Sequence, residues 1–164
     1  MKFTSSIVKA RWQGPLGAMI VAATDSGVAG VWFEGQKHMP EHSRWREDAT
    51  HVHIRAAIAQ LAEYFDGKRS TFDLPLDLAA GTPFQQSVWR ALVAIPHGAT
   101  TNYGALGRGI GAPAAARAVG AAVGRNPVSI VVPCHRVLGT GGALTGYAGG
   151  LERKSALLKL EGAL

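Results

Sequence analysis

Apolar residues in the first half of the chain gather into two short runs and one longer periodic segment. The runs over residues 18–24 and 28–33 are separated by Asp25-Ser26-Gly27, whose composition favours a turn, so the pattern predicts a β-hairpin. Over residues 51–65 the apolar side chains recur at helical spacing, and Gly67 follows the last of them. This segment is therefore predicted to be a helix.

Less regular segments follow the hairpin and the helix. Residues 36–50 are polar and have no period, which is typical of a loop. Residues 72–76 alternate apolar and polar side chains and contain Pro75, so we expect an edge strand. Residues 78–81 are the expected linker to the second half.

The second half begins with a helix-start signal. Thr82-Pro83-Phe84-Gln85 is a capping box with proline at the first helical position, and the helix is expected to stop before Pro96. Residues 103–110 and 114–124 are predicted to be two short helices joined by the turn at residues 111–113. Two short helices around a glycine-containing turn are typical of a helix-turn-helix, although the same geometry occurs in proteins that never bind DNA.

The helix predicted over 114–124 has two different faces. Three apolar side chains are expected to face the core: Ala116, Val119 and Val123. Three residues lie on the opposite side at a spacing of four: Arg117, Ala121 and Arg125. This small outer face would allow close approach to a nucleic-acid backbone, and arginine would add charge. The alternative is an alanine-rich packing helix with two solvated arginines.

Together these patterns predict an α/β fold in two parts. Residues 1–78 are expected to form a small antiparallel sheet with a helix. Residues 82–164 are expected to form a mostly helical domain with the helix-turn-helix, a glycine-rich surface loop over 138–144 and a last helix over 151–160. Three leucines of the last helix are available to pack: Leu151, Leu157 and Leu158.

Charge is divided unevenly between the two parts. Residues 1–80 contain nine Lys/Arg and nine Asp/Glu, whereas residues 81–164 contain eight Lys/Arg and two acids, so the whole net charge of +6 lies in the second part. A basic half suits a polyanion such as DNA, whereas a solvated basic face would serve solubility alone. No apolar run is long enough for a membrane span, and a single cysteine fits a reducing compartment, so we expect a cytoplasmic protein without a membrane partner.

Four histidines lie in or beside the polar loop: His38, His42, His51 and His53. Metal binding is conceivable, but no cysteine accompanies them and the loop has no fixed geometry. Solvated side chains are therefore expected, with neither a metal nor a cofactor.

The candidate chemistry centres on Cys134, the only cysteine. It follows a β-branched run, residues 130–132, and Pro133, and His135 comes directly after it. A short buried strand would deliver Cys134 to a surface turn, where an imidazole could take the thiol proton. Adjacent residues on a strand point to opposite faces, so His135 can assist only if the chain turns at Pro133 or a water bridges the two side chains. The alternative is that Cys134 is a small buried hydrophobe.

The stretch Pro133-Cys134-His135-Arg136-Val137 resembles the active site of the O6-alkylguanine-DNA alkyltransferases. Asn126-Pro127 upstream and the segment Leu144–Gly150 downstream extend the resemblance, which runs from Thr82 to Gly162 and more loosely across the first half. The resemblance implies irreversible, single-turnover transfer of an alkyl group from O6-alkylguanine in double-stranded DNA to a cysteine. It also implies a ribonuclease H-like first half and a monomer that can bind DNA cooperatively.

The resemblance assigns roles to individual residues at the reactive centre. It makes Cys134 the nucleophile, His135 the base that activates it through a water, and Glu161 the carboxylate that orients the histidine. Asn126 would brace the active-site turn. Without the resemblance, Glu161 would be interpreted as a solvated helix end.

Other residues are implied to hold DNA or the damaged base. Tyr103 would rotate the phosphate backbone and assist proton transfer, and Arg117 would fill the gap left by a flipped nucleotide. The carbonyls of Cys134 and Val137 would accept from the guanine amine. Tyr147 and Ala148 would provide the pocket wall and a backbone donor. We expect Arg125 to contact phosphate.

Three other classes of protein remain open. A non-enzymatic alkyltransferase-like protein binds damaged DNA, but that class has another residue in place of Cys134. A helix-turn-helix regulator with an incidental cysteine does not account for Asn126, His135 and Glu161 in register. A cysteine hydrolase would use a similar set of side chains.

Overall fold

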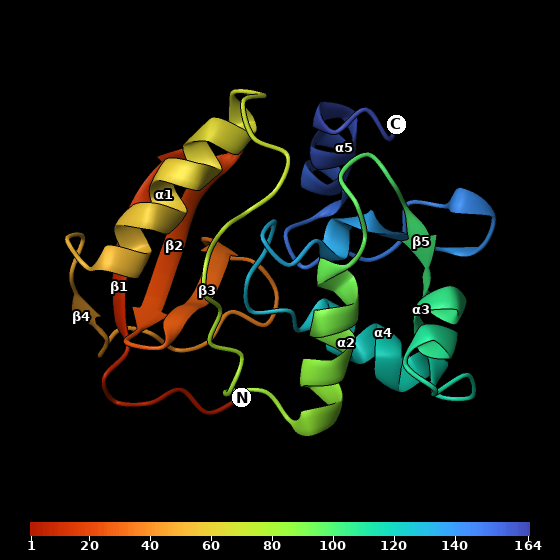
Figure 1. The fold of residues 1–164 in the computed structure, drawn as a ribbon, viewed down its shortest axis with the longest axis horizontal. Helices are drawn as coiled ribbons and strands as arrows, with labels where there is room; N and C mark the ends of the chain where they lie inside the picture. The colour runs from red at the N-terminus through yellow and green to blue at the C-terminus, as the bar shows by residue number, and fades with distance from the viewer.

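The computed structural model describes residues 1–164 and places a small sheet covered by one helix beside a group of short helices (Figure 1). The sheet has the order β3-β2-β1-β4, from β1 (Val8–Gly14), β2 (Gly17–Thr24), β3 (Gly27–Phe33) and β4 (Arg46–Glu47). The predicted hairpin is confirmed as β2 and β3. Strand β1 was not predicted. Because β4 pairs in parallel with β1, the sheet is mixed rather than wholly antiparallel, and the predicted loop over 36–50 is interrupted.

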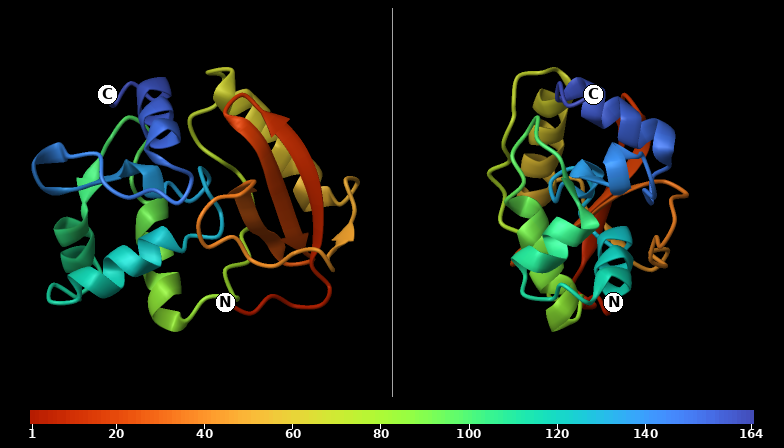
Figure 2. Two further views of the ribbon diagram at one scale, coloured as in Figure 1. Left: turned by 180° about the vertical axis from the view of Figure 1, so that it is seen from behind. Right: turned by 90° about the vertical axis from the view of Figure 1, so that its right-hand side faces the viewer.

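Helix α1 (Val52–Phe65) crosses one face of the sheet and confirms the predicted helix (Figures 1 and 2). It buries the stripe Ile54, Ala57, Leu61 and Tyr64. The edge strand predicted over 72–76 is wrong. Only Leu76 forms a single bridge, to Val28, and the carbonyl of Pro75 accepts a bond from the Val28 N–H at 2.8 Å.

The second half contains the predicted helices with small changes at their ends: α2 (Pro83–Val93), α3 (Tyr103–Gly109), α4 (Ala116–Gly124) and α5 (Leu151–Leu160). The capping box of α2 is present in both directions, because Gln85 N–H donates to Thr82 Oγ1 at 3.1 Å and Thr82 N–H donates to Gln85 Oε1 at 3.0 Å. Two very short strands, β5 (Thr101–Asn102) and β6 (Val137–Leu138), pair in parallel.

Two expectations about helix faces are wrong. Ala116 lies at the first position of α4 and is exposed, whereas Ala122 joins Val119 and Val123 in the core. Leu151 begins α5 and is 48% exposed, so it does not pack as expected. The exposed positions of Arg117, Ala121 and Arg125 agree with the prediction.

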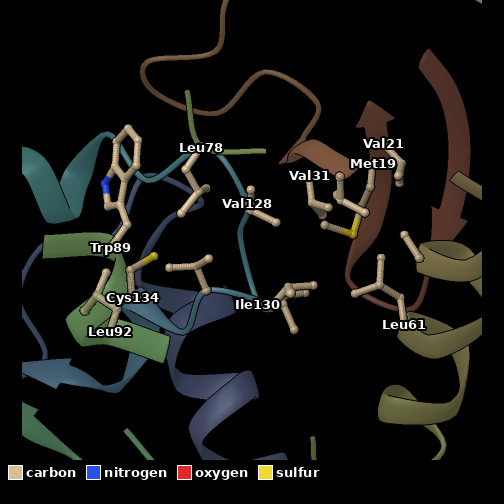
Figure 3. Packing of buried hydrophobic residues seen from close by; sticks show 14 of the residues in the cluster. Met19, Val21, Val31, Leu61, Leu78, Trp89, Leu92, Val128, Ile130 and Cys134 are labelled. Carbon is tan, nitrogen blue, oxygen red and sulfur yellow. The ribbon is translucent and has the colours of Figure 1, made fainter. Parts of the chain in front are cut away.

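One continuous apolar core joins the two halves. Figure 3 shows Val128 and Ile130 between the side chains of α2 and those of the sheet. Backbone bonds cross the same boundary, since Val31 N–H donates to Pro127 O at 2.8 Å and Ser129 N–H donates to Val31 O at 2.9 Å. The segment of residues 127–130 is therefore held by the sheet on one side and by α2 on the other. None of the helices has the length and apolar character that a bilayer crossing would require.

Candidate active site

The segment that leads to Cys134 is a series of buried turns, so the strand predicted over 130–132 is wrong. Val131 N–H donates to Ser129 O, and Cys134 N–H donates to Val132 O, both at 2.8 Å. Ile130 has φ of +72°, an uncommon value for a β-branched residue, which marks local strain. The β-branched residues 130–132 are therefore buried within tight turns and do not pair with another strand.

Cys134 is buried and begins a 3-10 turn, η1 (Cys134–Arg136), instead of lying on a surface turn. Its exposed fraction is 6%. The chain turns at Pro133. This turn is one of the two arrangements, the other being a bridging water, that would let His135 assist the thiol.

Asn126 holds this turn through its side chain. Its Oδ1 accepts from Val128 N–H at 2.9 Å, and its Nδ2 donates to Val132 O at 2.7 Å. Asn126 is itself buried, so the two bonds satisfy groups that water does not reach. One amide thus fixes both ends of the turn that precedes Cys134.

A buried hydrogen-bonded group lies next to Cys134. Nε2 of His135 lies 2.8 Å from Oε2 of Glu161, and neither side chain has exposed surface. Arg136 forms two parallel bonds with the same carboxylate, from Nε to Oε1 at 2.8 Å and from Nη2 to Oε2 at 2.9 Å. Tyr64 of α1 adds a fourth donor, 2.6 Å from Oε2. Glu161 is therefore a buried, four-times-bonded carboxylate and not a solvated helix end.

The proton positions follow from this arrangement. A carboxylate can only accept, so Nε2 of His135 carries the proton that faces Glu161. Nδ1 of His135 is buried and makes no hydrogen bond within the protein. In the neutral imidazole this nitrogen is a proton acceptor. The histidine can therefore take up one proton at Nδ1 while Glu161 holds the other side of the ring.

Burial and hydrogen bonding shift the pKa values of all three groups. Burial raises the pKa of the Cys134 thiol to about 11, against smaller opposing effects of Asn126 and Lys154. Burial lowers the pKa of His135, although its bond to Glu161 acts in the opposite direction. Burial would raise the pKa of Glu161, but hydrogen bonds from His135 and Arg136 outweigh it and lower the pKa overall. At neutral pH the site thus contains a thiol, a neutral imidazole and a carboxylate.

A cavity of ≈ 200 Å³ opens beside Cys134. Tyr103, Tyr147 and Ala148 line it, and α4 contributes the small residue Gly120. The Tyr103 hydroxyl lies 3.5 Å from the carbonyl oxygen of Thr145. Burial raises the pKa of Tyr103 and raises that of Tyr147 further, so both hydroxyls keep their protons at neutral pH. The cavity is large enough for a single planar ring system.

The remaining predicted residues lie outside the cavity lining. Arg117 and Arg125 are exposed on α4, on the face turned away from the core. Val137 is buried, and its carbonyl already accepts a bond from Lys154 Nζ at 2.6 Å. A carbonyl oxygen has a second lone pair, so this bond leaves room for another donor. The four loop histidines belong to no group of three or more potential metal ligands.

Sequence comparison identifies both halves of the chain. Residues 83–163 match the 6-O-methylguanine DNA methyltransferase, DNA binding domain, and residues 7–78 match the 6-O-methylguanine DNA methyltransferase, ribonuclease-like domain. The chain belongs to the 6-O-methylguanine DNA methyltransferase family. The two matches together span most of the sequence.

Individual members of the methyltransferase family are similar along nearly their whole length. The methylated-DNA–protein-cysteine methyltransferase of Mycolicibacterium paratuberculosis is 48% identical over 147 residues, which are 90% of this chain and 87% of the relative. That of Methanosarcina acetivorans is 46% identical over 152 residues, 92% and 96% of the two chains. The crystal structure of Mycobacterium tuberculosis OGT in complex with DNA superimposes with a TM-score of 0.85 at 44% identity and covers 96% of this chain and 92% of that one.

Sequence reasoning missed several residues of this candidate site. Lys154 is wholly buried and donates to three carbonyls, those of Val137, Thr145 and Gly146. Tyr64 lies 97 residues from its partner Glu161, at an ordinary apolar position of an amphipathic helix. No local pattern distinguishes Tyr64 from a core residue. A lysine in the first half of α5 beside buried leucines was a signal that could have been used for Lys154.

Two further missed residues come from the first half of the chain. Lys37 and His38 line the cavity, and the Lys37 N–H donates to Ala148 O at 3.1 Å. His38 has φ of +61°. The loop after β3 therefore forms part of the cavity rim, although the sequence predicted only a solvated loop there.

Proposed function

We propose that this protein repairs O6-alkylguanine in double-stranded DNA by transferring the alkyl group irreversibly to Sγ of Cys134, once per molecule. The observation that carries the proposal is the position of Cys134 at a base-sized cavity, directly before a histidine bonded to a buried carboxylate. The names of the similar methyltransferases, which act on methylated DNA and a protein cysteine, support the same reaction.

The transfer is a displacement at the alkyl carbon. The thiol loses its proton, the Sγ–carbon bond forms, and the carbon–O6 bond breaks with its electron pair moving to the purine. The purine takes up a proton and leaves as neutral guanine, so the thiol proton is balanced by the proton gained. With a thiol pKa of about 11, the resting site holds almost no thiolate at neutral pH, and a base must act.

His135 is the proposed base. Its Nδ1 is the free acceptor, and a water between Nδ1 and Sγ would relay the proton, as the family resemblance implies. Glu161 orients the ring and stabilises the imidazolium that forms. Asn126 fixes the turn that presents Sγ.

DNA recognition is assigned to the second half. We infer that α3 and α4 act as a helix-turn-helix, with the small outer face of α4 against the DNA backbone. Arg117 replaces the flipped nucleotide in the stack, and Arg125 binds phosphate. Tyr103 and the backbone around Tyr147 and Ala148 hold the extruded base.

The proposal extends to organisation and context. We propose two domains, residues 1–78 and 82–164, in a monomer that can bind DNA cooperatively. A lone cysteine that must stay reduced to react suits the cytoplasm. The reaction as written uses neither metal nor cofactor.

Incubation with a duplex oligonucleotide that contains one O6-methylguanine tests the proposal. The intact protein should gain one methyl group per molecule, peptide mapping should place it on Cys134, and an unmethylated duplex should give no change. Cys134→Ser should abolish the gain while DNA affinity is kept. Methylation of another residue would overturn the assignment of Cys134 as the nucleophile. Repair of more than one equivalent of O6-methylguanine per protein would overturn the single-turnover mechanism and favour a hydrolase.

A further inference from the structure

The carboxylate of Glu161 receives donors from both halves of the chain. Its Oε2 accepts from His135, from Arg136 and from the hydroxyl of Tyr64, whereas Oε1 accepts from Arg136 alone. Tyr64 belongs to the last turn of α1, in the half that packs against the sheet. The Tyr64 bond of 2.6 Å has the length of a charge-assisted O–H···O⁻ bond.

The ring of Tyr64 is held in place independently of this bond. It is 1% exposed and makes aromatic contacts with Phe65 and Phe72, at centroid distances of 5.3 and 5.5 Å. His97 lies at 6.3 Å in an edge-on contact. A phenylalanine could make all three contacts, so packing alone does not require the hydroxyl.

We propose that Tyr64 is a positioning residue of the alkyl-transfer site, through which the first half of the chain sets the basicity of His135. Its hydroxyl holds Oε2 of Glu161 against the imidazole and reduces the negative charge that this oxygen presents to Nε2. The proposal rests on the proposed function of Cys134 and gives the first half a part in the reaction beyond support.

The physical argument is a competition for one oxygen. Each donor to a carboxylate stabilises its ionised form and makes it a weaker proton acceptor. With fewer donors on Oε2, the interaction with a protonated His135 strengthens, and the imidazolium is favoured. Tyr64 therefore acts in the same direction as burial of the ring.

Other charged groups around the pair remain unchanged when the hydroxyl is removed. Arg136 of η1 and Lys154 of α5 both disfavour the imidazolium, whereas Glu161 favours it. Cys134 precedes the histidine, and His97 faces the ring of Tyr64 from the loop after α2. The hydroxyl of Tyr64 is a neutral donor, so its removal changes no formal charge.

Tyr64→Phe is the deciding variant, and Ile54→Val is its control on the same helix. Ile54 is wholly buried and has no polar atom, so shortening it lowers stability without touching the carboxylate. In Tyr64→Phe the acid limb of the transfer rate against pH should move upward by roughly one pH unit, the equivalent of one hydrogen bond to a charged group. In Ile54→Val the limb should stay in place.

Two measurements on the full-length protein separate the possible failures. Single-turnover transfer from a methylated duplex, from about pH 5 to about pH 9, gives the rate profile, and an NMR titration gives the pKa of His135 directly. Superimposable titrations of His135 in the wild type and Tyr64→Phe would overturn this inference. Absence of transfer in the wild type would instead overturn the proposed function, and the NMR titration would still decide the role of Tyr64.

A second variant keeps the test decisive if Tyr64→Phe fails to fold. Incorporation of 3-fluorotyrosine at position 64 retains the ring and makes its hydroxyl a stronger donor. The His135 titration should then move to lower pH, opposite to the phenylalanine variant. A shift in the same direction, or none, would count against the proposed coupling.

Discussion

Lys154 Nζ lies 2.6 Å from the carbonyl oxygen of Val137, and the lysine has no exposed surface. The same ammonium donates to Thr145 O and Gly146 O, so it joins the segment after Cys134 to the loop on the far side of the cavity. Burial lowers the pKa of Lys154, which means that the surrounding carbonyls only partly replace water.

Replacing this lysine should damage both stability and transfer. Lys154→Met keeps the apolar stem but leaves three buried carbonyls without a donor, and we expect a loss of roughly 2–4 kcal/mol in the free energy of unfolding. Transfer should slow because the cavity wall is no longer held. Lys159→Met, an exposed site on the same helix, is the matched control in urea denaturation and single-turnover assays.

The two members of the histidine–carboxylate pair should differ in what they lose. His135→Ala should slow transfer by about 10²–10⁴-fold, the range for a general base, with DNA affinity kept. Glu161→Gln should slow transfer less but also destabilise the fold, because Arg136 becomes a buried cation without its anion. Transfer rates and thermal denaturation of both variants give the comparison. Wild-type rates in both would mean that the thiolate forms without this pair.

Stability should depend on pH through Glu161. Its pKa in the folded protein lies below the ordinary value of 4.5, so its contribution is fully present above that value and is lost as the pH falls through the lower, folded pKa. The difference in unfolding free energy between the wild type and Glu161→Gln should therefore be constant near neutrality and shrink in acid. A difference that stays flat to low pH would show that the carboxylate is not held ionised by its neighbours.

Arg117 and Arg125 should separate base flipping from phosphate binding. If Arg117 occupies the stack, Arg117→Ala should reduce repair of duplex DNA far more than reaction with free O6-alkylguanine, and Arg117→Lys should restore little because lysine lacks the planar group. Arg125→Ala should weaken binding to all DNA and reduce the salt dependence by about one unit of slope. Equal losses on duplex and free base for Arg117→Ala would remove the stacking role.

The sequence predicted those helices and strands that are determined by residues close to one another in the chain. The hairpin, α1 and α2 follow from turn residues, helical spacing and a capping box, all within a few positions. Strand β1 also has a local signal, because Val8, Ala10 and Trp12 alternate with polar residues. The failures at 72–76 and 130–132 share one reason. Apolar or β-branched composition reports burial, and a strand also needs a partner with free backbone groups.

The residues of the candidate site also fall into those with a local sequence signal and those without one. Cys134 and His135 are neighbours in sequence, and Asn126 reaches Val132 only six residues away, so a compact motif carries them. Glu161 reached the site only through the family resemblance. Tyr64 could not be predicted, because its function depends on how two halves pack and its helix position looks apolar.

The outer edge of β3 has a consequence for folding and solubility. Its backbone groups are bonded to Pro127 and Ser129 at one end and to Pro75 and Asp77 at the other, so no second chain can extend the sheet there. A fragment cut at the linker would leave part of that edge bare and should associate with itself. In the intact chain these bonds cover the exposed edge of β3, which protects the sheet from aggregation. Because the bonds at Pro127 and Ser129 join the two halves, we expect both halves to unfold in one cooperative transition.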